Sequence, residues 1–405
     1  MHTSDKTTNK RTTHIHNSNK RLELCLTGVR LLKTFLTILL IALPLLTITS
    51  FYMIPSHLVI YICSLIVLFI LELTLFWIGI LLVYCTSVQL GLKLRIIGIV
   101  CGMMPIIHII VLLRIIKIVS EEIRFETQRM LLNQSRKEAQ ICQTQYPVLL
   151  VHGVFFRDFK HANYWGRIPA DLIANGACVY YGNHHSAASV EYCGKELAER
   201  IQEVLAMTNA KKVNIIAHSK GGLDCRYAIS CCGMAPYVAS LTTINTPHRG
   251  CEFADYLLNK VPVKTLNQVA ASYNATMKKL GDTTPDFVAA IKDLTSSRCE
   301  TLNQEMHDDK NVFYQSVGSK LIHAVNGKFP LNFTYPLVKY FDGPNDGLVS
   351  ETSFHWGTNY TFLVPSGKRG ISHADMIDLN RENIKGFDVR EFYITILADL
   401  KKRGL

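Results

Sequence analysis

Residues 211–222 read KKVNIIAHSKGG, and this stretch decides the fold. The run from Lys211 to Ala217 is short and mainly apolar, which predicts a buried parallel strand. A serine on the sharp turn from such a strand into a helix needs small neighbours two residues away on either side, because the backbone closes tightly there. Ala217 and Gly221 supply them. The stretch therefore predicts that Ser219 is a nucleophile, the alternative being an ordinary turn that contains a serine.

Strand-like and helix-like segments alternate on both sides of this stretch. Short apolar runs at residues 148–151, 178–181 and 360–364 predict further strands, and residues 191–206 predict a helix. Alternating strands and helices are typical of an α/β fold with a mostly parallel sheet covered by helices on both faces. With a serine on the strand-to-helix turn, we expect the α/β-hydrolase fold over residues 145–405.

The first third of the chain has a different composition. Residues 34–54, 58–83 and 96–113 form three long apolar runs with few charges, whereas the rest of the chain alternates like a soluble protein. The third run is interrupted by glycines and a proline. We expect three N-terminal segments: a basic tail at 1–33, a transmembrane region of two to three helices at 34–119, and a charged helical connector at 120–144.

The basic charge of the chain is concentrated in this apolar third. The formal net charge is +11, and residues 1–144 hold 15 Lys and Arg against 7 Asp and Glu. Basic residues beside apolar spans predict a cytoplasmic N-terminus on a multi-pass integral membrane protein. They also argue against nucleic acid as a partner. If the third run spans the membrane, the large domain is extracytoplasmic; if it lies in the interface or re-enters, the domain is cytoplasmic.

Glu72 lies near the middle of the second apolar run. A carboxylate in hydrocarbon is costly, so such a residue is either functional or neutral and structurally paired. His108, in the third run, is a conceivable partner. Both interpretations of Glu72 stay open.

A serine nucleophile needs a histidine that takes its proton and a carboxylate that orients the histidine. In this fold they follow in the order Ser, acid, His. His373 lies between the strand-like run at 360–364 and the C-terminal helical segment, where the base is expected. For the acid we favour Asp346, in an Asn-Asp-Gly turn, over Asp342. Asp375 could orient the loop of the base or bind a cation.

Acyl transfer also needs two backbone N–H groups directed at the developing oxyanion. One usually comes from the residue after the nucleophile and one from a loop after an earlier strand. The candidates are the amides of Lys220 and Val154, the second following an apolar strand and His152-Gly153. Gly153 would let this loop approach closely, although a glycine here could also be a routine turn residue.

Five motifs in collinear order resemble the bacterial true lipases of the Pseudomonas and Burkholderia type. They are YPVLLVHG (146–153), NYW (163–165), KVNIIAHS (212–219), TTINTPHRG (242–250) and NDGLVS (345–350). The resemblance covers roughly residues 145–380 and implies hydrolysis of acyl-lipid esters. It implies Ser219, Asp346 and His373 as the triad and the Val154 and Lys220 amides as the oxyanion hole. It also implies a mobile apolar lid within Glu252–Thr295.

The chain departs from those lipases at the calcium site that the resemblance implies. Asp375 matches one of the two aspartates that bind calcium, but the position of the other falls near Ala324, and a further ligand position holds Leu379. Thr352 stands in the place of a cysteine that forms a disulfide in those secreted enzymes. We therefore expect no required cofactor and keep Asp375 as a candidate calcium ligand.

Three functions stay open for this chain. The leading hypothesis is a membrane-anchored lipase or esterase. The second is a phospholipase or thioesterase of the same fold, since a triad specifies acyl transfer but not the acyl group. The third is a membrane protein whose hydrolase domain only binds or scaffolds. The presence of Ser219, Asp346 and His373 together favours an enzyme.

Overall fold

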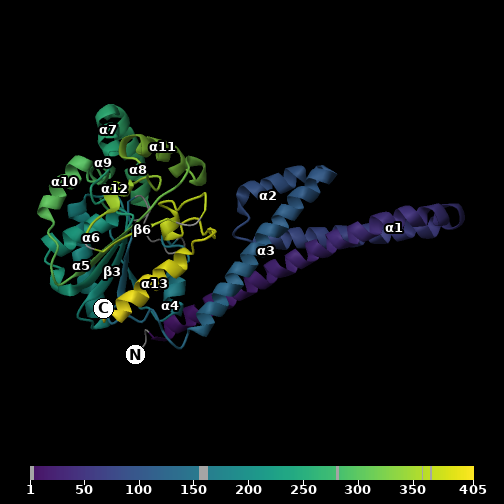
Figure 1. Ribbon diagram of the computed structural model, residues 1–405, viewed down its shortest axis with the longest axis horizontal. Helices are drawn as coiled ribbons and strands as arrows, with labels where there is room; N and C mark the ends of the chain where they lie inside the picture. Colours follow the sequence, from purple (N-terminus) through teal and green to yellow (C-terminus); the bar gives the residue numbers. More distant parts are fainter. Residues whose placement is uncertain (1–3, 155–162, 280–281, 358, 365–366) are drawn as a thin grey trace. The chain divides into compact units, whose positions relative to one another are not determined.

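The computed structural model describes residues 4–154, 163–279, 282–357, 359–364 and 367–405. The chain folds into two compact units, Met1–Gln134 and Ser135–Leu405 (Figure 1). The boundary falls about ten residues before residue 145, where we expected the large domain to begin.

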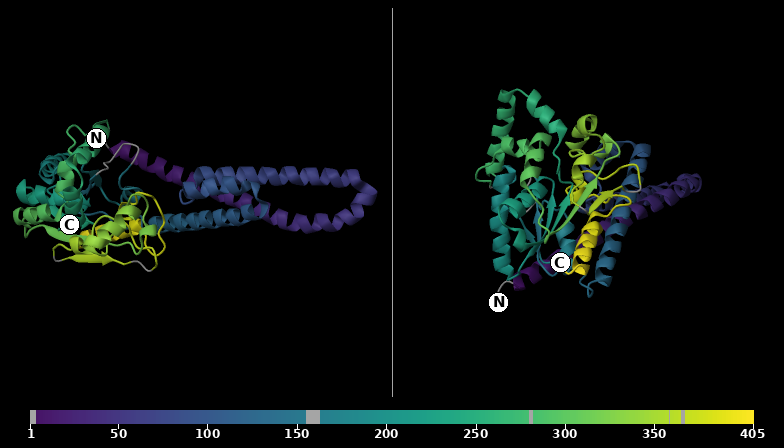
Figure 2. Two further views of the ribbon diagram at one scale, coloured as in Figure 1. Left: turned by 90° about the horizontal axis from the view of Figure 1, so that it is seen from above. Right: turned by 60° about the vertical axis from the view of Figure 1, so that its left-hand side comes forward.

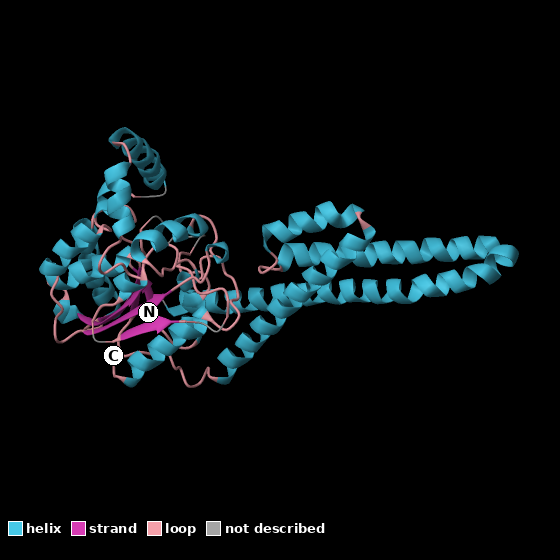
Figure 3. Ribbon diagram, turned by 45° about the horizontal axis from the view of Figure 1, so that its top comes forward, coloured by secondary structure: helices cyan, strands magenta, loops and turns pink. Residues whose placement is uncertain are grey.

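The N-terminal unit consists of helices. They are α1 (Ser4–Thr86), α2 (Gly91–Val100), the 3₁₀ helix η1 (Cys101–Met103) and α3 (Pro105–Ser135). Helix α1 contains a non-helical residue, His57, where the chain turns back into a helical hairpin (Figure 3). Its two halves pack closely, since a Cβ added at Gly28 would lie 2.9 Å from Leu82 Cβ. The first two apolar runs therefore form one antiparallel helix pair.

One helix among the described residues is long and apolar enough to cross a membrane, Lys20–Thr86, judged by length and composition. The third apolar run does not form one continuous helix. Helix α2 ends at Val100 and α3 begins at Pro105, with η1 between them. Proline has no N–H to donate and is favoured in the first turn of a helix, so the run is divided there.

Glu72 is 9% exposed, and its carboxylate accepts no hydrogen bond from any described residue. The conceivable partner His108 bonds elsewhere, with its Nδ1 3.2 Å from the Gly102 carbonyl oxygen. The Glu72–His108 pair that we considered is therefore not formed.

The C-terminal unit is built on one parallel sheet (Figure 1). Its strand order is β2-β1-β3-β4-β5-β6. The strands are β1 (Val148–Val151), β2 (Val179–Tyr181), β3 (Val213–His218), β4 (Val238–Ile244), β5 (Phe313–Ser319) and β6 (Tyr360–Leu363). A parallel sheet with flanking helices confirms the predicted α/β class.

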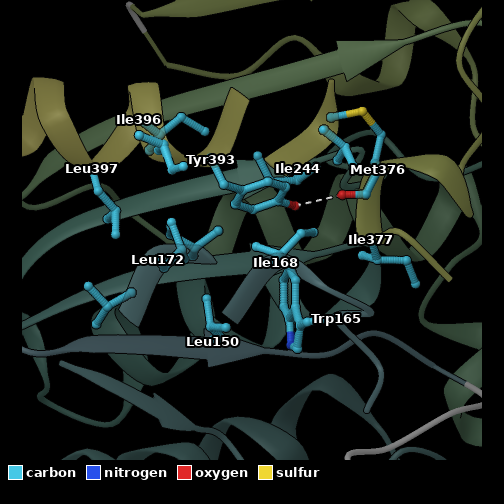
Figure 4. Packing of buried hydrophobic residues seen from close by; sticks show 14 of the residues in the cluster. Leu150, Trp165, Ile168, Leu172, Ile244, Met376, Ile377, Tyr393, Ile396 and Leu397 are labelled. Atoms are coloured by element: carbon cyan, nitrogen blue, oxygen red, sulfur yellow. Dashed lines mark hydrogen bonds between the residues drawn. The ribbon is translucent and has the colours of Figure 1, made fainter. Parts of the chain in front are cut away.

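Alternate side chains of the strands enter two hydrophobic cores, one on each face of the sheet. On one face Leu150 packs with residues of α4 (Ile168–Ala174) and α13 (Val389–Lys402). Figure 4 shows this core, in which the Tyr393 hydroxyl donates to the Met376 carbonyl at 2.9 Å. On the other face Leu149 packs with α5 (Val190–Thr208) and α6 (Lys220–Cys231). Because successive side chains of a strand point to opposite faces, both faces of the sheet are buried.

The remaining α-helices of the described residues lie in the two long connections around β5. Between β4 and β5 they are α7 (Glu252–Lys260), α8 (Val263–Lys279), α9 (Phe287–Lys292) and α10 (Ser296–Glu305). Between β5 and β6 they are α11 (Leu331–Asp342) and α12 (Glu351–Phe354). Helices α7 and α8 project away from the sheet (Figures 2 and 3) and fall within the segment where we expect a lid.

Candidate active site

Ser219 lies on a strained turn between β3 and α6. Its φ is +56° and its ψ is −135°, a conformation that residues other than glycine adopt only where the surrounding structure holds them. The Ser219 amide donates to the Ile244 carbonyl at 2.9 Å, and the Gly222 amide donates to the Ser219 carbonyl at 3.0 Å. Strain of this kind is a mark of functional positions and is typical of the serine turn in α/β-hydrolases.

Two glycines allow this turn to close. A Cβ added at Gly153 would lie 2.7 Å from Ser219 Cβ, and one added at Gly221 would lie 2.3 Å from the His152 carbonyl oxygen. Real Cβ atoms do not approach so closely. The loop after β1 therefore packs directly against the serine turn, as its sequence predicts.

The two amides that we predicted as oxyanion donors flank this contact. Helix α6 begins at Lys220, so the Lys220 amide belongs to the first helical turn, where N–H groups have no helical acceptor. The positive end of the helix dipole is also located there. Val154 directly follows Gly153, the residue in contact with Ser219. Both candidates therefore lie beside the predicted nucleophile.

The predicted base and acid are hydrogen-bonded to each other. His373 Nδ1 lies 2.6 Å from Asp346 Oδ2, and the His373 amide donates to the Asp346 carbonyl at 2.9 Å. Both side chains are buried. Asp342, the acid that we disfavoured, instead accepts from the first amides of α7, those of Glu252 and Phe253, at 2.9 and 3.2 Å. Asp342 is thus a helix-capping residue.

Three further donors surround the Asp346 carboxylate. Asn245 Nδ2 donates to Oδ2 at 2.6 Å, and the Leu348 and Val349 amides donate to Oδ1, each at 2.9 Å. A buried carboxylate held by four donors has a fixed orientation. We did not single out Asn245 from the sequence. The sequence feature that could have identified Asn245 is its position directly after β4, within the motif at 242–250.

His218, the residue before Ser219, contacts His373. The His218 ring packs against the His373 ring, with centroids 4.4 Å apart, and His218 Nδ1 is 2.7 Å from the Tyr164 hydroxyl. Burial lowers the pKa of His218 well below its usual value, with a further contribution from His373. Over the described ranges no hydrogen bond joins Ser219 to His373. Such bonds are often long in an enzyme without substrate.

Asp375 is occupied by an arginine rather than available to a metal ion. Arg369 Nη1 and Nη2 contact its two oxygens at 2.7 and 3.1 Å, and the Ser372 amide donates to it at 2.8 Å. The guanidinium supplies the positive charge that calcium would bring. The upstream ligand position near Ala324 holds no carboxylate, and Leu379 offers none. These residues do not fit a calcium site.

A cavity of about 310 Å³ lies apart from these groups. Its lining consists of Arg226, His248, Arg249, Asn303, His355, Trp356 and Gly357. None of Ser219, Asp346 and His373 lines it. The site is therefore defined by the strained serine and the His373–Asp346 contact, not by the cavity.

The sequence is similar to known lipases and esterases. The profile of the DUF676 serine esterase family matches residues 177–321. The triacylglycerol lipases of Pseudarthrobacter phenanthrenivorans and Burkholderia plantarii are each 40% identical over 175 residues, covering 40% of this chain and 54% and 48% of those proteins. The triacylglycerol lipase of Vibrio cholerae is 32% identical over 237 residues, covering 53% of this chain and 75% of that protein. The chain thus spans about half the length of the first two relatives.

Proposed function

This chain belongs to the triacylglycerol lipase family, and from that premise and the site geometry we propose that it is a carboxylic ester hydrolase with Ser219 as nucleophile. The observation that carries the proposal is the His373–Asp346 hydrogen bond of 2.6 Å beside a strained serine. Asp346 accepts a hydrogen bond from Nδ1–H of His373. This leaves Nε2 of His373 free of a proton and able to accept the one from the serine.

The reaction that we propose proceeds through an acyl-enzyme. Ser219 Oγ forms a bond to the ester carbonyl carbon while His373 takes the hydroxyl proton. His373 then gives this proton to the alcohol oxygen as the carbon–oxygen bond of the ester breaks. Water then attacks the carbonyl carbon of the acyl-enzyme while His373 takes its proton. The bond to Ser219 Oγ breaks, His373 returns the proton to Oγ, and the carboxylic acid is released. The amides of Val154 and Lys220 stabilise the oxyanion of each tetrahedral intermediate.

An exposed apolar surface supports esters of lipids as the substrate class. On and before α11, five large apolar side chains spaced three or four residues apart are 47% to 87% exposed: Val325, Phe329, Phe333, Leu337 and Tyr340. The opposite face of α11 packs on the loop of the acid, since a Cβ added at Gly347 would lie 2.9 Å from Leu331 Cβ. Several exposed large apolar side chains along one helix are unusual on soluble proteins and suit a lipid phase beside the site.

The proposal includes membrane attachment through the N-terminal helices, with the N-terminus in the cytoplasm. The helix Lys20–Thr86 supports attachment by its length and composition. Extraction of native membranes with alkaline carbonate and then with detergent tests this part. Release by carbonate alone would exclude a spanning anchor.

Hydrolysis of a panel of substrates tests the function itself. The full chain in detergent is assayed on p-nitrophenyl esters, triglycerides, phospholipids and acyl-thioesters, together with Ser219→Ala and the control Ser230→Ala. Ser230 lies on the same helix and donates to the His307 carbonyl. We expect ester hydrolysis to be lost in Ser219→Ala alone. Equal activity in both variants would contradict the assignment.

A further inference from the structure

The side chain of Lys220, the residue after the nucleophile, is buried within the fold. It is 1% exposed, and its Nζ lies 2.6 Å from Asp224 Oδ1 and 3.5 Å from Cys193 Sγ. Lysine is almost never fully buried without a partner. Burial alone would lower the pKa of Lys220, but Asp224, together with Cys193 and Asp293, outweighs burial and raises that pKa. The residue therefore keeps its charge and ties the first turn of α6 to the second.

Asp224 extends this contact towards the loop after β1. Its other oxygen, Oδ2, lies 3.6 Å from His184 Nε2. The His184 ring stacks on the His152 ring, with centroids 4.0 Å apart and planes 11° from parallel. All of these side chains are buried. A continuous series of buried contacts thus leads from Lys220 to His152, the residue that precedes Gly153.

The end of this chain acts on the peptide that carries the second candidate donor. His152 Nδ1 lies 2.9 Å from the Gly153 carbonyl oxygen, and its Nε2 lies 3.2 Å from the His184 carbonyl oxygen. Both carbonyls can only accept, and a neutral ring has one N–H, so we assign the proton to Nδ1, which makes the shorter contact. The Gly153 carbonyl and the Val154 N–H belong to one planar peptide unit and point in opposite directions. Fixing the carbonyl therefore fixes the direction of the Val154 N–H.

We propose a positioning network of four side chains, Lys220, Asp224, His184 and His152. It fixes the direction of the two oxyanion amides relative to each other. Lys220 carries one amide in its own backbone, and the far end of the network orients the amide of Val154. The proposal rests on the proposed ester hydrolysis and assigns to these side chains no contact with substrate. A preorganised pair of donors is needed because a misdirected amide stabilises the oxyanion poorly.

The same cluster does not fit a metal ion. His184, Cys193 and Asp224 bring three potential ligand atoms within 4.8 Å of one another. The Lys220 ammonium already contacts two of these ligands, Cys193 and Asp224. The ammonium of Lys220 would repel a metal cation bound there at close range. The positive charge that holds the cluster together is therefore the lysine.

The proposal must be separated from a purely structural ion pair, and a double variant does this. Lys220→Met or Asp224→Leu alone leaves one buried charge unpaired and lowers Tm, whereas the double variant removes both charges and recovers Tm. We expect kcat to stay about 10- to 100-fold below wild type in the double variant, with KM within about twofold, since the link between the amides is lost. Recovery of both Tm and kcat would overturn the proposal.

His152 gives an independent test at the other end of the network. His152→Leu removes the donor to the Gly153 carbonyl, while the amide nitrogen of His152→Asn can take the position of Nδ1 and donate in its place. We expect kcat to fall about 10- to 100-fold in His152→Leu and to be largely retained in His152→Asn. Binding of a trifluoromethyl ketone, which forms a tetrahedral adduct, should weaken in the same order. Equal losses in both variants would contradict the network.

Failure of this proposal is distinguishable from failure of the proposed function. A wild-type protein with no activity on any ester would contradict the proposed function, and the network with it. An active wild type whose double variant has unchanged kcat would contradict the network alone. Both readouts come from the same preparations of the full chain.

Discussion

His373 Nδ1 and Asp346 Oδ2 lie 2.6 Å apart, and the His373 amide donates to the carbonyl of the same aspartate. Two contacts therefore fix the imidazole, one through its ring and one through its backbone. A ring held in this way has its Nδ1 proton on the side of the carboxylate. This relationship carries the assignment of acid and base.

Asp346→Asn should lower kcat by about 10³- to 10⁴-fold with little change in KM, because the amide donates where the carboxylate accepted and reverses the tautomer of His373. Steady-state kinetics on a soluble ester, with circular dichroism as a check of folding, measure this. Asp342→Asn is the matched control, since Asp342 caps α7. A larger loss in Asp342→Asn than in Asp346→Asn would reverse the assignment of the acid.

Gly153→Ala should abolish most activity without unfolding the domain. The new Cβ would meet Ser219 Cβ at 2.7 Å, so the oxyanion loop must move away from the nucleophile. We expect kcat to fall by about 100-fold or more, the scale of losing one oxyanion donor. Gly102→Ala serves as control, because no heavy atom lies within 4 Å of its added Cβ. Wild-type rates in Gly153→Ala would show that the loop does not approach the serine.

Acid should destabilise the protein through two buried histidines. Burial lowers the pKa of His218 and His248 well below the usual value, with Arg226 and Arg249 adding to the effect at His248. Below about pH 6.5 such a ring takes up a proton only on unfolding, so the free energy of unfolding falls as pH falls. Each histidine contributes about 1.4 kcal/mol per pH unit there.

His248→Gln isolates one of these contributions. The glutamine amide can replace the contact of His248 Nε2 with the Thr243 hydroxyl, 2.9 Å long, without titrating. Urea unfolding from about pH 5 to about pH 7.5 should give an acid slope shallower than wild type by about 1.4 kcal/mol per pH unit. Parallel slopes would mean that His248 is protonated in the folded state.

Removal of calcium should leave the protein unaffected. Arg369 contacts both oxygens of Asp375, which corresponds to a calcium-ligand position in the lipases that the sequence resembles. Treatment with EDTA should leave Tm unchanged and alter kcat by less than about twofold, since a cation that is not bound adds no stability by mass action. Inactivation by EDTA with rescue by calcium would contradict the role given to Arg369.

The exposed surface of α11 should matter only for substrates in a lipid phase. Phe329→Ser, Phe333→Ser and Tyr340→Ser combined remove apolar area that would enter the interface. We expect about a tenfold loss on emulsified triglyceride and no more than about a twofold change on a soluble p-nitrophenyl ester. The control combines Met207→Ser and Tyr237→Ser, which change exposed side chains elsewhere in the unit. Equal losses on both substrates would indicate a folding defect instead.

Local features of the sequence predicted the serine turn and four of the six described strands, whereas β4 and β5 were not predicted. Strand β1 has the predicted bounds, and β3 ends at His218, one residue past the predicted run. The turn could be predicted because its requirement for small residues is satisfied within five positions, from Ala217 to Gly221. Turn chemistry likewise favoured Asp346 over Asp342 as the acid. Its distance from His373 in the chain was no obstacle, because we expected the order Ser, acid, His.

Features that depend on distant segments meeting could not be predicted. A lysine is expected to be solvated, but Cys193 of α5 contacts the Lys220 ammonium, and His184 contacts its helical partner Asp224. The outward direction of Phe333 also contradicts the expectation that aromatic residues of an amphipathic helix face the core. These departures from local rules occur beside the site, where function is expected to override them.

The central claim is that Ser219 is the nucleophile, and the site of a covalent adduct tests it most directly. The full chain is treated with a fluorophosphonate, digested, and its modified peptide is identified by mass spectrometry, with Ser219→Ala and Ser230→Ala in parallel. We predict one adduct, on Ser219, in the wild type and in Ser230→Ala, and no adduct in Ser219→Ala. An active enzyme that carries its adduct on another residue, or that labels equally well without Ser219, would contradict the claim.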